Sequence, residues 1–158
     1  MGFAKLSLKG RALKLLSQRE HSRLELQRKL AAYVEEGDDL NAILDELEKR
    51  GFISVQRVVQ SVIHSKASRF GTARLVQELR SKGLDDETVR DASEQLRDTE
   101  LQRARDLWCK RFGAPPADIK EKAKQLRFMA SRGFSSAVVL RVLRDAPYSA
   151  FDENDDQA

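Results

Sequence analysis

Apolar residues recur at intervals of three and four along almost the whole chain. This spacing gathers them on one side of a helix, whereas a strand would show alternation with a period of two. Glycines interrupt the pattern at short intervals, at Gly37, Gly51, Gly71, Gly83, Gly113 and Gly133. Because glycine commonly ends helices, the sequence predicts an all-α protein made of short helices.

Three of these glycines mark an internal repeat. Gly37, Gly83 and Gly133 are separated by 46 and 50 residues, and the four additional residues fall in the Ala-Pro-Pro-Ala stretch 114–117. Apolar residues stand seven before, four before and six after the glycines: Leu30, Val76 and Leu126; Tyr33, Leu79 and Met129; Ile43, Val89 and Val139. Any helical chain yields some coincident apolar positions, but the shared phase of three glycines favours tandem helical modules.

Each repeat is expected to contain three helices, over about 10–22, 22–35 and 38–50 in the first repeat. The repeats are placed at 1–52, 53–99 and 100–147, with linkers near 51–55 and 97–101. An acidic tail, 148–158, is predicted to be disordered. Small helical units bury their apolar faces against their neighbours, so we expect three tandem three-helix repeats in an elongated, curved molecule.

Composition excludes several classes of protein. One cysteine in 158 residues precludes an intrachain disulfide, and with only two histidines beside it there are too few ligands for a structural zinc site. No apolar run approaches the roughly 20 residues of a membrane span, and the first ten residues lack the apolar core of an export signal. We therefore expect a reduced, cytoplasmic protein without membrane contact, metal or cofactor.

The net charge of +4 conceals a segregation along the chain. Three basic stretches, 5–29, 57–82 and 120–132, carry +6, +5 and +4, while the acidic stretches 35–48 and 85–100 contain seven carboxylates each. The tail contributes −4, which leaves +8 on the residues up to 148. Basic bands of this kind can follow an acidic surface or a phosphate backbone. Alternatively, the charges solvate helix surfaces and pair within their own repeat.

The sequence contains no catalytic constellation, which indicates a protein that is not an enzyme. Ser22 and Glu25 have the spacing of a helix capping box, which explains the neighbours of His21 better than a nucleophile and base would. His64 is expected to be a partly buried helix histidine, and Cys109 a small core residue.

Aromatic residues are few, so nucleic-acid binding would be directed at the backbone and weakly specific. The motif Arg69-Phe70-Gly71 recurs as Arg111-Phe112-Gly113, 42 residues later. Both phenylalanines could stack on bases, but contacts with the core at helix ends are the favoured interpretation.

Four segments resemble bacterial RecX regulators, in the right order and at the right separations from Leu8 to Ala146. The first is ALKLLSQREHSRLEL (12–26) with Lys29-Leu30, and the second is GTARL (71–75) with Glu78-Leu79 and Lys82-Gly83. The third and fourth are KRFG (110–113) and RGFS (132–135). The chain departs from the family at the start of the second repeat. Family members usually have an acidic residue followed by an aromatic residue there, whereas this chain has Val55 and Val58. The helix is expected to persist there, because Val58 still fits the apolar stripe.

The resemblance implies a regulator of recombination, DNA repair and the SOS response that has no enzymatic activity. Such a protein binds RecA and its filament on single-stranded DNA and inhibits RecA ATPase, strand exchange and co-protease activity, by groove binding or filament capping. We expect a monomer with weak direct DNA binding, and the alternative is a RecA-independent DNA-binding protein with helix-turn-helix-like repeats. The candidate binding residues for RecA or DNA are the basic residues of repeats two and three: Arg57, Lys66, Arg69, Arg74, Arg80, Lys82, Lys124, Arg127 and Arg132.

Overall fold

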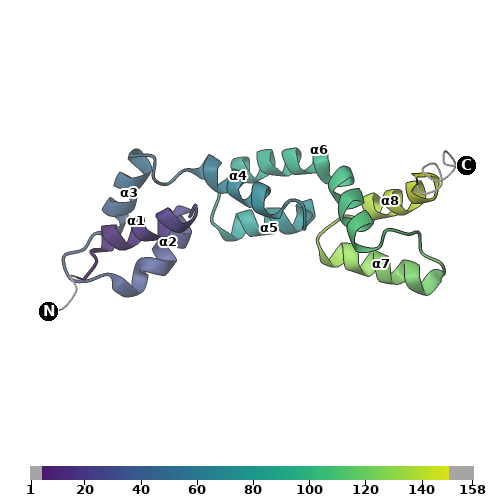
Figure 1. The fold of residues 1–158 in the computed structure, drawn as a ribbon. Coiled ribbons are helices and arrows are strands. Elements are labelled where there is room, and N and C mark those ends of the chain that lie inside the picture. Colours follow the sequence, from purple (N-terminus) through teal and green to yellow (C-terminus); the bar gives the residue numbers. More distant parts are fainter. Residues whose placement is uncertain (1–4, 150–158) are drawn as a thin grey trace, which may run out of the picture.

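The computed structural model describes the backbone of residues 5–149 and the side chains of residues 5–146, and this part of the chain is helical. The helices are α1 (Leu8–Gln18), α2 (Arg23–Leu30), α3 (Leu40–Lys49), α4 (Val55–Lys66), α5 (Thr72–Ser81), α6 (Asp86–Arg111), α7 (Ile119–Ser131) and α8 (Ser136–Ser149), with a 3-10 turn at Ala31–Tyr33. Figure 1 shows them as an elongated row of three helical clusters, with α1–α3 at one extreme and α7 and α8 at the other.

Each repeat has a hydrophobic core of its own. Leu26, Leu44 and Leu47 centre the first core, and Leu75, Leu79 and Leu96 the second. Trp108, Met129 and Val139 belong to the third. Separate cores strung along the chain are the mark of a repeat protein, in which each unit packs mainly on its neighbours. The prediction of an all-α chain of tandem three-helix repeats is confirmed.

The prediction of a linker near 97–101 is wrong, because those residues lie in the middle of α6. No glycine or proline occurs between Asp86 and Arg111, so nothing interrupts the helix over 26 residues. Its first half supplies Leu96 to the second core, and its second half supplies Ala104 and Trp108 to the third. One continuous helix therefore serves as the third helix of repeat two and the first helix of repeat three.

Local signals at the helix ends explain most of the boundaries. The capping box predicted at Ser22 and Glu25 is present, since the Ser22 hydroxyl accepts from the Glu25 N–H while the Glu25 carboxylate accepts from the Ser22 N–H. The three glycines that mark the repeat all have positive φ, +87° at Gly37, +77° at Gly83 and +89° at Gly133. This conformation costs other residues free energy, so glycine is favoured at all three positions. Gly83 and Gly133 directly follow the C-caps of α5 and α7, whereas Gly37 lies in the turn that leads to α3.

Two expectations about burial are wrong, and Tyr33, one of the apolar repeat positions, is not buried. Tyr33 is 48% exposed, with the Arg11 guanidinium 4.0 Å from its ring centroid. His64 is exposed and not partly buried, and Cys109 is exposed and not in the core. Each successive helical residue is rotated by about 100°, so a residue next to a buried one faces away from the core. By contrast, Val58 is 2% exposed and confirms that α4 survives the departure at its start.

The acidic tail lies almost entirely outside the described residues, which end at 149. The last helix, α8, extends to Ser149 and so includes the first two positions assigned to that tail. Among the helices of the described part, none combines the length and the apolar character needed to cross a bilayer.

Candidate functional site

Consecutive repeats meet through equivalent pairs of helix ends. At the first junction, the start of α2 lies on the end of α5, and the Ser22 hydroxyl donates to the Lys82 carbonyl oxygen over 2.7 Å. At the second junction, the start of α5 lies on the end of α7, and the Gly71 N–H donates to the Arg132 carbonyl oxygen over 2.7 Å. Ser22 and Gly71 are N-cap residues, while Lys82 and Arg132 are C-cap residues. The two junctions therefore share one design.

Glycine permits this close approach of the repeats. A Cβ on Gly71 would lie 2.3 Å from the carbonyl carbon of Gly133, and a Cβ on Gly133 would lie 2.5 Å from the Cβ of Arg74. At the first junction, a Cβ on Gly83 would lie 2.7 Å from a methyl group of Leu24. The second junction thus brings backbone against backbone, whereas the first brings backbone against a side chain.

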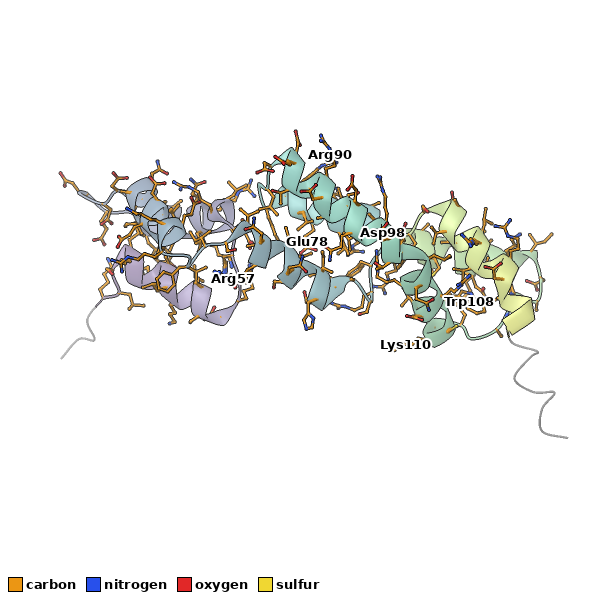
Figure 2. All side chains as sticks on the ribbon, turned by 90° about the horizontal axis from the view of Figure 1, so that it is seen from above. Arg57, Glu78, Arg90, Asp98, Trp108 and Lys110 are labelled. Carbon is orange, nitrogen blue, oxygen red and sulfur yellow. The ribbon has the colours of Figure 1, made fainter. Side chains whose placement is uncertain are left out.

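Carboxylates neutralise the cations of the first junction. Lys82 Nζ lies 3.0 Å from Glu25 Oε1, and Arg19 Nη2 lies 2.6 Å from Glu25 Oε2. Arg57, which Figure 2 shows where the first repeat meets the second, pairs with Glu20 at 2.8 Å. The side chains of Lys82 and Glu25 are only 15% and 14% exposed. These ion pairs hold repeat one on repeat two.

The Glu25 carboxylate is the electrostatic centre of the first junction. Burial raises its pKa, but hydrogen bonds from Arg19, from the Ser22 N–H and from Lys82 outweigh burial and lower the pKa to about 2. A carboxylate held so strongly in its charged form contributes stability at every pH well above its pKa.

His21 is a second buried group at the same junction, 1% exposed. Its Nδ1–H donates to the Arg19 carbonyl over 3.0 Å, so Nε2 accepts from Lys29 Nζ at 3.2 Å. Burial lowers the pKa of His21, and the charges of Arg19 and Lys29 lower it further, against an opposing effect of the backbone hydrogen bond. The imidazole is therefore a neutral structural group at neutral pH.

The second junction carries the opposite charge at its equivalent position. The residue three after the N-cap is Glu25 in α2 but Arg74 in α5. The Arg74 guanidinium lies 4.0 Å from the ring centroid of Phe70, and that of Arg132 lies 5.7 Å from the same centroid. Within the described part of the chain, neither guanidinium has a carboxylate within 4.0 Å.

The aromatic rings of the second junction are covered by guanidinium groups. Arg111 and Arg132 lie 5.2 and 5.1 Å from the ring centroid of Phe128, and Phe112 meets that ring edge-on at 5.4 Å. Phe70 and Phe112 pack against the second and third cores, which confirms the preference for core contacts. Cation–π contacts of this kind hold cationic side chains near one another without neutralising them.

A cleft of about 680 Å³ opens beside these rings, and its surface is mainly apolar. Leu107 and Phe128 contribute apolar side chains, and five cations surround them against a single carboxylate, Asp106. That carboxylate already accepts from Gln102 over 2.9 Å. The lining residues are Ser68, Arg69, Arg103, Asp106, Leu107, Lys110, Arg111, Phe128 and Arg132. The cleft is suited to an anionic partner that also carries an apolar group.

Two residues in the middle of α6 fix the shape of this junction. Arg103 donates to the carbonyls of Phe70 at 2.6 Å and Ala67 at 2.9 Å, and thereby holds the end of α4. The buried Glu100 carboxylate accepts from the Thr72 N–H at 3.1 Å and caps the start of α5. Burial lowers the pKa of Arg103, partly offset by Glu100. Both side chains position the basic residues around them.

The structure brings together only part of the predicted set. Arg69, Arg74 and Arg132 gather at the second junction, where Arg69 Cζ is 5.3 Å from the Phe70 centroid. Lys66 pairs with Glu78 inside repeat two. Arg57 and Lys82 belong to the first junction. The other three candidates, Arg80, Lys124 and Arg127, are exposed and have no ion pair among the described residues.

Arg80 lines a different groove, of about 770 Å³. That groove mixes charges of both signs, from Asp86, Arg90, Glu94, Arg97 and Glu100 among others. Figure 2 shows Arg90 and Lys110 at opposite edges of the molecule, so this groove and the cleft face different sides. Mixed charge makes the groove a weaker candidate than the cleft for an anionic partner.

Sequence reasoning missed Arg103, Lys110, Arg111 and Phe128 as site residues. The signal for Arg111 was present, since the Arg-Phe-Gly motif that repeats Arg69–Gly71 contains it. Residues of the described part do not gather three or more His, Cys, Asp or Glu side chains in an arrangement that could hold a metal ion.

Two family models match consecutive parts of the chain. A model of the second three-helix domain of RecX matches residues 56–92, and a model of the third three-helix domain of RecX matches residues 98–143. The third-domain match begins inside α6, at the point where that helix passes from the second core to the third.

Curated relatives match nearly the whole chain. The chain is 56% identical to "Regulatory protein RecX" of Leptothrix cholodnii over 149 residues, which are 94% of this chain and 95% of that protein. It is 50% identical to "Regulatory protein RecX" of Ralstonia nicotianae, over 96% of this chain and 94% of that protein. The solved structure "Crystal structure of RecX from Lactobacillus salivarius" shares the fold, with a TM-score of 0.72, 18% identity and coverage of 89% of this chain and 95% of that one.

Proposed function

Because the chain belongs to the RecX family of regulatory proteins, we propose that it binds RecA and RecA filaments on single-stranded DNA. Bound there, it inhibits RecA ATPase, strand exchange and co-protease activity. An elongated array of repeats can contact more than one protomer of a helical filament, either in its groove or at its end. A regulator changes the rate of ATP hydrolysis by RecA only if it binds one conformational state of RecA more tightly than another. The surface that makes this contact is therefore the part of the molecule to identify.

The second junction is the proposed contact surface. One observation carries this choice, namely that Arg74 and Arg132 have no carboxylate partner within the described part of the chain, while the equivalent cations of the first junction are paired. Unpaired cations can attract an anionic surface and exchange their water for its carboxylates or phosphates. We extend the surface along α7 with Lys124 and Arg127, which are exposed in the same repeat.

The other predicted cations take a supporting role in this proposal. Arg57 and Lys82 hold repeat one against repeat two, and Lys66 braces α4 against α5 through Glu78. Substituting them would disturb the fold and any binding together, so they are poor probes of the contact with RecA.

The test is a titration of the protein into RecA ATPase on single-stranded DNA, run beside its binding to the same DNA without RecA. We expect inhibition at concentrations well below those that coat the DNA. Inhibition that appears only when the DNA is coated, with a steep dependence on salt, would instead show RecA-independent DNA binding.

Two variants localise the contact. Arg69→Glu reverses a charge at the second junction, and we expect it to weaken inhibition about tenfold, the loss of one charge-assisted contact. Lys14→Glu makes the same change on the exposed surface of α1 and serves as the matched control. Equal inhibition by the two variants would remove the second junction from the proposal.

A further inference from the structure

At the first junction, the chain itself supplies the anion that binds the cations at the end of the repeat. The Glu25 carboxylate lies between Lys82 and Arg19 and also accepts from the Ser22 N–H. At the second junction the equivalent residue is Arg74, so the chain places a cation where the carboxylate would be. The junction therefore has the geometry of a closed ion-pair cluster without its acidic member.

The cleft beside this junction also has an apolar part, next to the cations that have no acidic partner among the described residues. Leu107 and Phe128 line it, and Arg69, Lys110 and Arg111 surround them. A volume of about 680 Å³ is within the range of sites that enclose small ligands or a few side chains. The complementary group combines negative charge with an apolar side chain, because only such a group satisfies both parts of the lining.

The aromatic rings distinguish between two classes of anionic partner. Single-stranded nucleic acids bind through bases that stack on open aromatic faces, together with phosphates on basic residues. At this junction the Phe70 ring has Arg74 at 4.0 Å from its centroid, and the Phe128 ring has Arg111 and Arg132 at 5.2 and 5.1 Å. A ring face that already contacts a guanidinium group is not open for base stacking, whereas the part of Phe128 that lines the cleft can still contact an apolar side chain, so the lining favours a protein partner.

We infer that the second junction is a docking cleft for an acidic segment of a partner protein. Its carboxylates pair with the guanidinium groups of Arg69, Arg111 and Arg132, and its apolar side chain lies on Leu107 and Phe128, all of which line the cleft. This inference rests on the proposed function, in which RecA is the partner, and adds the chemistry of the segment that is recognised. Guanidinium and carboxylate groups form paired hydrogen bonds, which give such a cleft specificity as well as attraction.

The experiment measures two kinds of binding by fluorescence anisotropy. The first probe is a labelled 12-residue peptide with one phenylalanine between pairs of glutamates, and the second is a labelled dT oligonucleotide. The double variant Arg111→Gln/Arg132→Gln removes two charges from the cleft, and Lys110→Gln removes one from its exposed rim without touching the core. Lys14→Gln is the matched control on α1.

We expect the wild-type protein and Lys14→Gln to bind the peptide equally, Lys110→Gln about threefold more weakly, and the double variant at least tenfold more weakly. The peptide should also compete with RecA for the wild-type protein. Circular dichroism confirms that the variants keep their helices, and Lys110→Gln alone tests the cleft if the double variant unfolds.

The outcomes separate this inference from the function on which it rests. Inhibition of RecA that is unchanged in both cleft variants would leave the proposed function standing and overturn the docking cleft. Cleft-dependent binding of the peptide without any inhibition of RecA would support the cleft and overturn the proposed function. If the variants lose binding of dT while the wild-type protein ignores the peptide, the cleft is a nucleic-acid site and the inference is wrong.

Discussion

The two junctions between repeats join equivalent helix ends but carry opposite charges at one equivalent position. Each places an N-cap residue of one repeat on the C-cap carbonyl of the next over 2.7 Å. At the first, Glu25 neutralises Lys82, and the carboxylate is almost enclosed. At the second, Arg74 takes the position of Glu25, and among the described residues Arg74 and Arg132 contact aromatic rings and not carboxylates.

This difference teaches that the number of basic residues in a segment says little about its availability for binding. The basic stretches 5–29 and 57–82 carry +6 and +5, yet several of their cations are paired within the chain. A cation that is already paired and half-buried gains little from a second anion, because its desolvation has been offset by the first. The second junction retains cations with unused hydrogen-bonding capacity.

The largest losses of stability should come from substitutions of the junction glycines, because the repeats approach each other most closely there. Gly71→Ala places a Cβ 2.3 Å from backbone atoms of Gly133, and we expect a loss of about 3 to 4 kcal/mol in the free energy of unfolding. Gly83→Ala meets the movable side chain of Leu24 at positive φ and should cost about 2 kcal/mol. Urea unfolding followed by circular dichroism measures both.

Gly37→Ala is the control for the glycine series. Its φ is also positive, +87°, but nothing lies within 4 Å of the added Cβ. The expected cost is about 1 kcal/mol, from backbone strain alone. A Gly71→Ala protein as stable as Gly37→Ala would contradict the close approach of repeats two and three.

Spacing in the sequence was enough to predict the repeats, because helix ends and core positions are local properties. Glycine at positive φ and a capping serine act within one turn, so Gly83, Gly133 and Ser22 could be placed correctly. The equivalence of Lys82 and Arg132 was equally visible, since each precedes one of these glycines. Local pattern thus predicted the architecture and three cations of the second junction, Arg69, Arg74 and Arg132.

The rest of the site depends on partners distant in sequence. Lys82 and Arg132 look alike in the chain, and only their tertiary neighbours, Glu25 and Arg74, make one an ion-paired structural residue and leave the other without a carboxylate partner among the described residues. Arg103 was missed because its acceptors, including the Phe70 carbonyl, lie some 30 residues away. Absence of glycine and proline from 86–111 was the one local signal that could have predicted a continuous α6.

Acid should weaken the first junction before the second. The Glu25 carboxyl has a pKa of about 2, below the 4.5 of a free side chain, so its stabilisation is complete above pH 4.5 and is lost as the pH falls toward 2. The size of this pKa difference corresponds to roughly 3 kcal/mol. The lowered pKa of His21 adds a loss of stability that begins below about pH 6.5. Within the described residues, no carboxylate forms an ion pair with Arg74 or Arg132 at the second junction, and the buried Glu100 there accepts from the Thr72 N–H instead.

Two probes separate the repeats in this acid titration. Trp108 is the only tryptophan and lies in the third core, so its fluorescence reports on repeat three. Circular dichroism reports on all the helices, and its signal should begin to fall at a higher pH than the tryptophan signal. In the Glu25→Gln variant, the loss of circular dichroism signal between pH 4.5 and 2 should be smaller than in the wild-type protein. Coincident transitions in the wild-type protein would show that the repeats unfold as one unit and would contradict this order.

The smallest change in stability should come from giving the second junction the acid of the first. Arg74→Glu places a carboxylate three residues after the N-cap of α5, where it can pair with Arg132 as Glu25 pairs with Lys82. We expect the free energy of unfolding to rise by up to about 1 kcal/mol, while inhibition of RecA weakens about tenfold. Urea unfolding and RecA ATPase on single-stranded DNA measure the two effects on one preparation.

Arg74→Gln distinguishes the two consequences of this substitution, because it removes the cation without adding an acid. It should weaken inhibition less than Arg74→Glu does and should not stabilise the fold, since no new ion pair with Arg132 forms. A protein that becomes more stable as it loses its activity is the expected result if the second junction keeps its cations unpaired for a partner. If Arg74→Glu instead lowers stability and inhibition together, Arg74 supports the fold, and the contrast between the junctions has no bearing on binding.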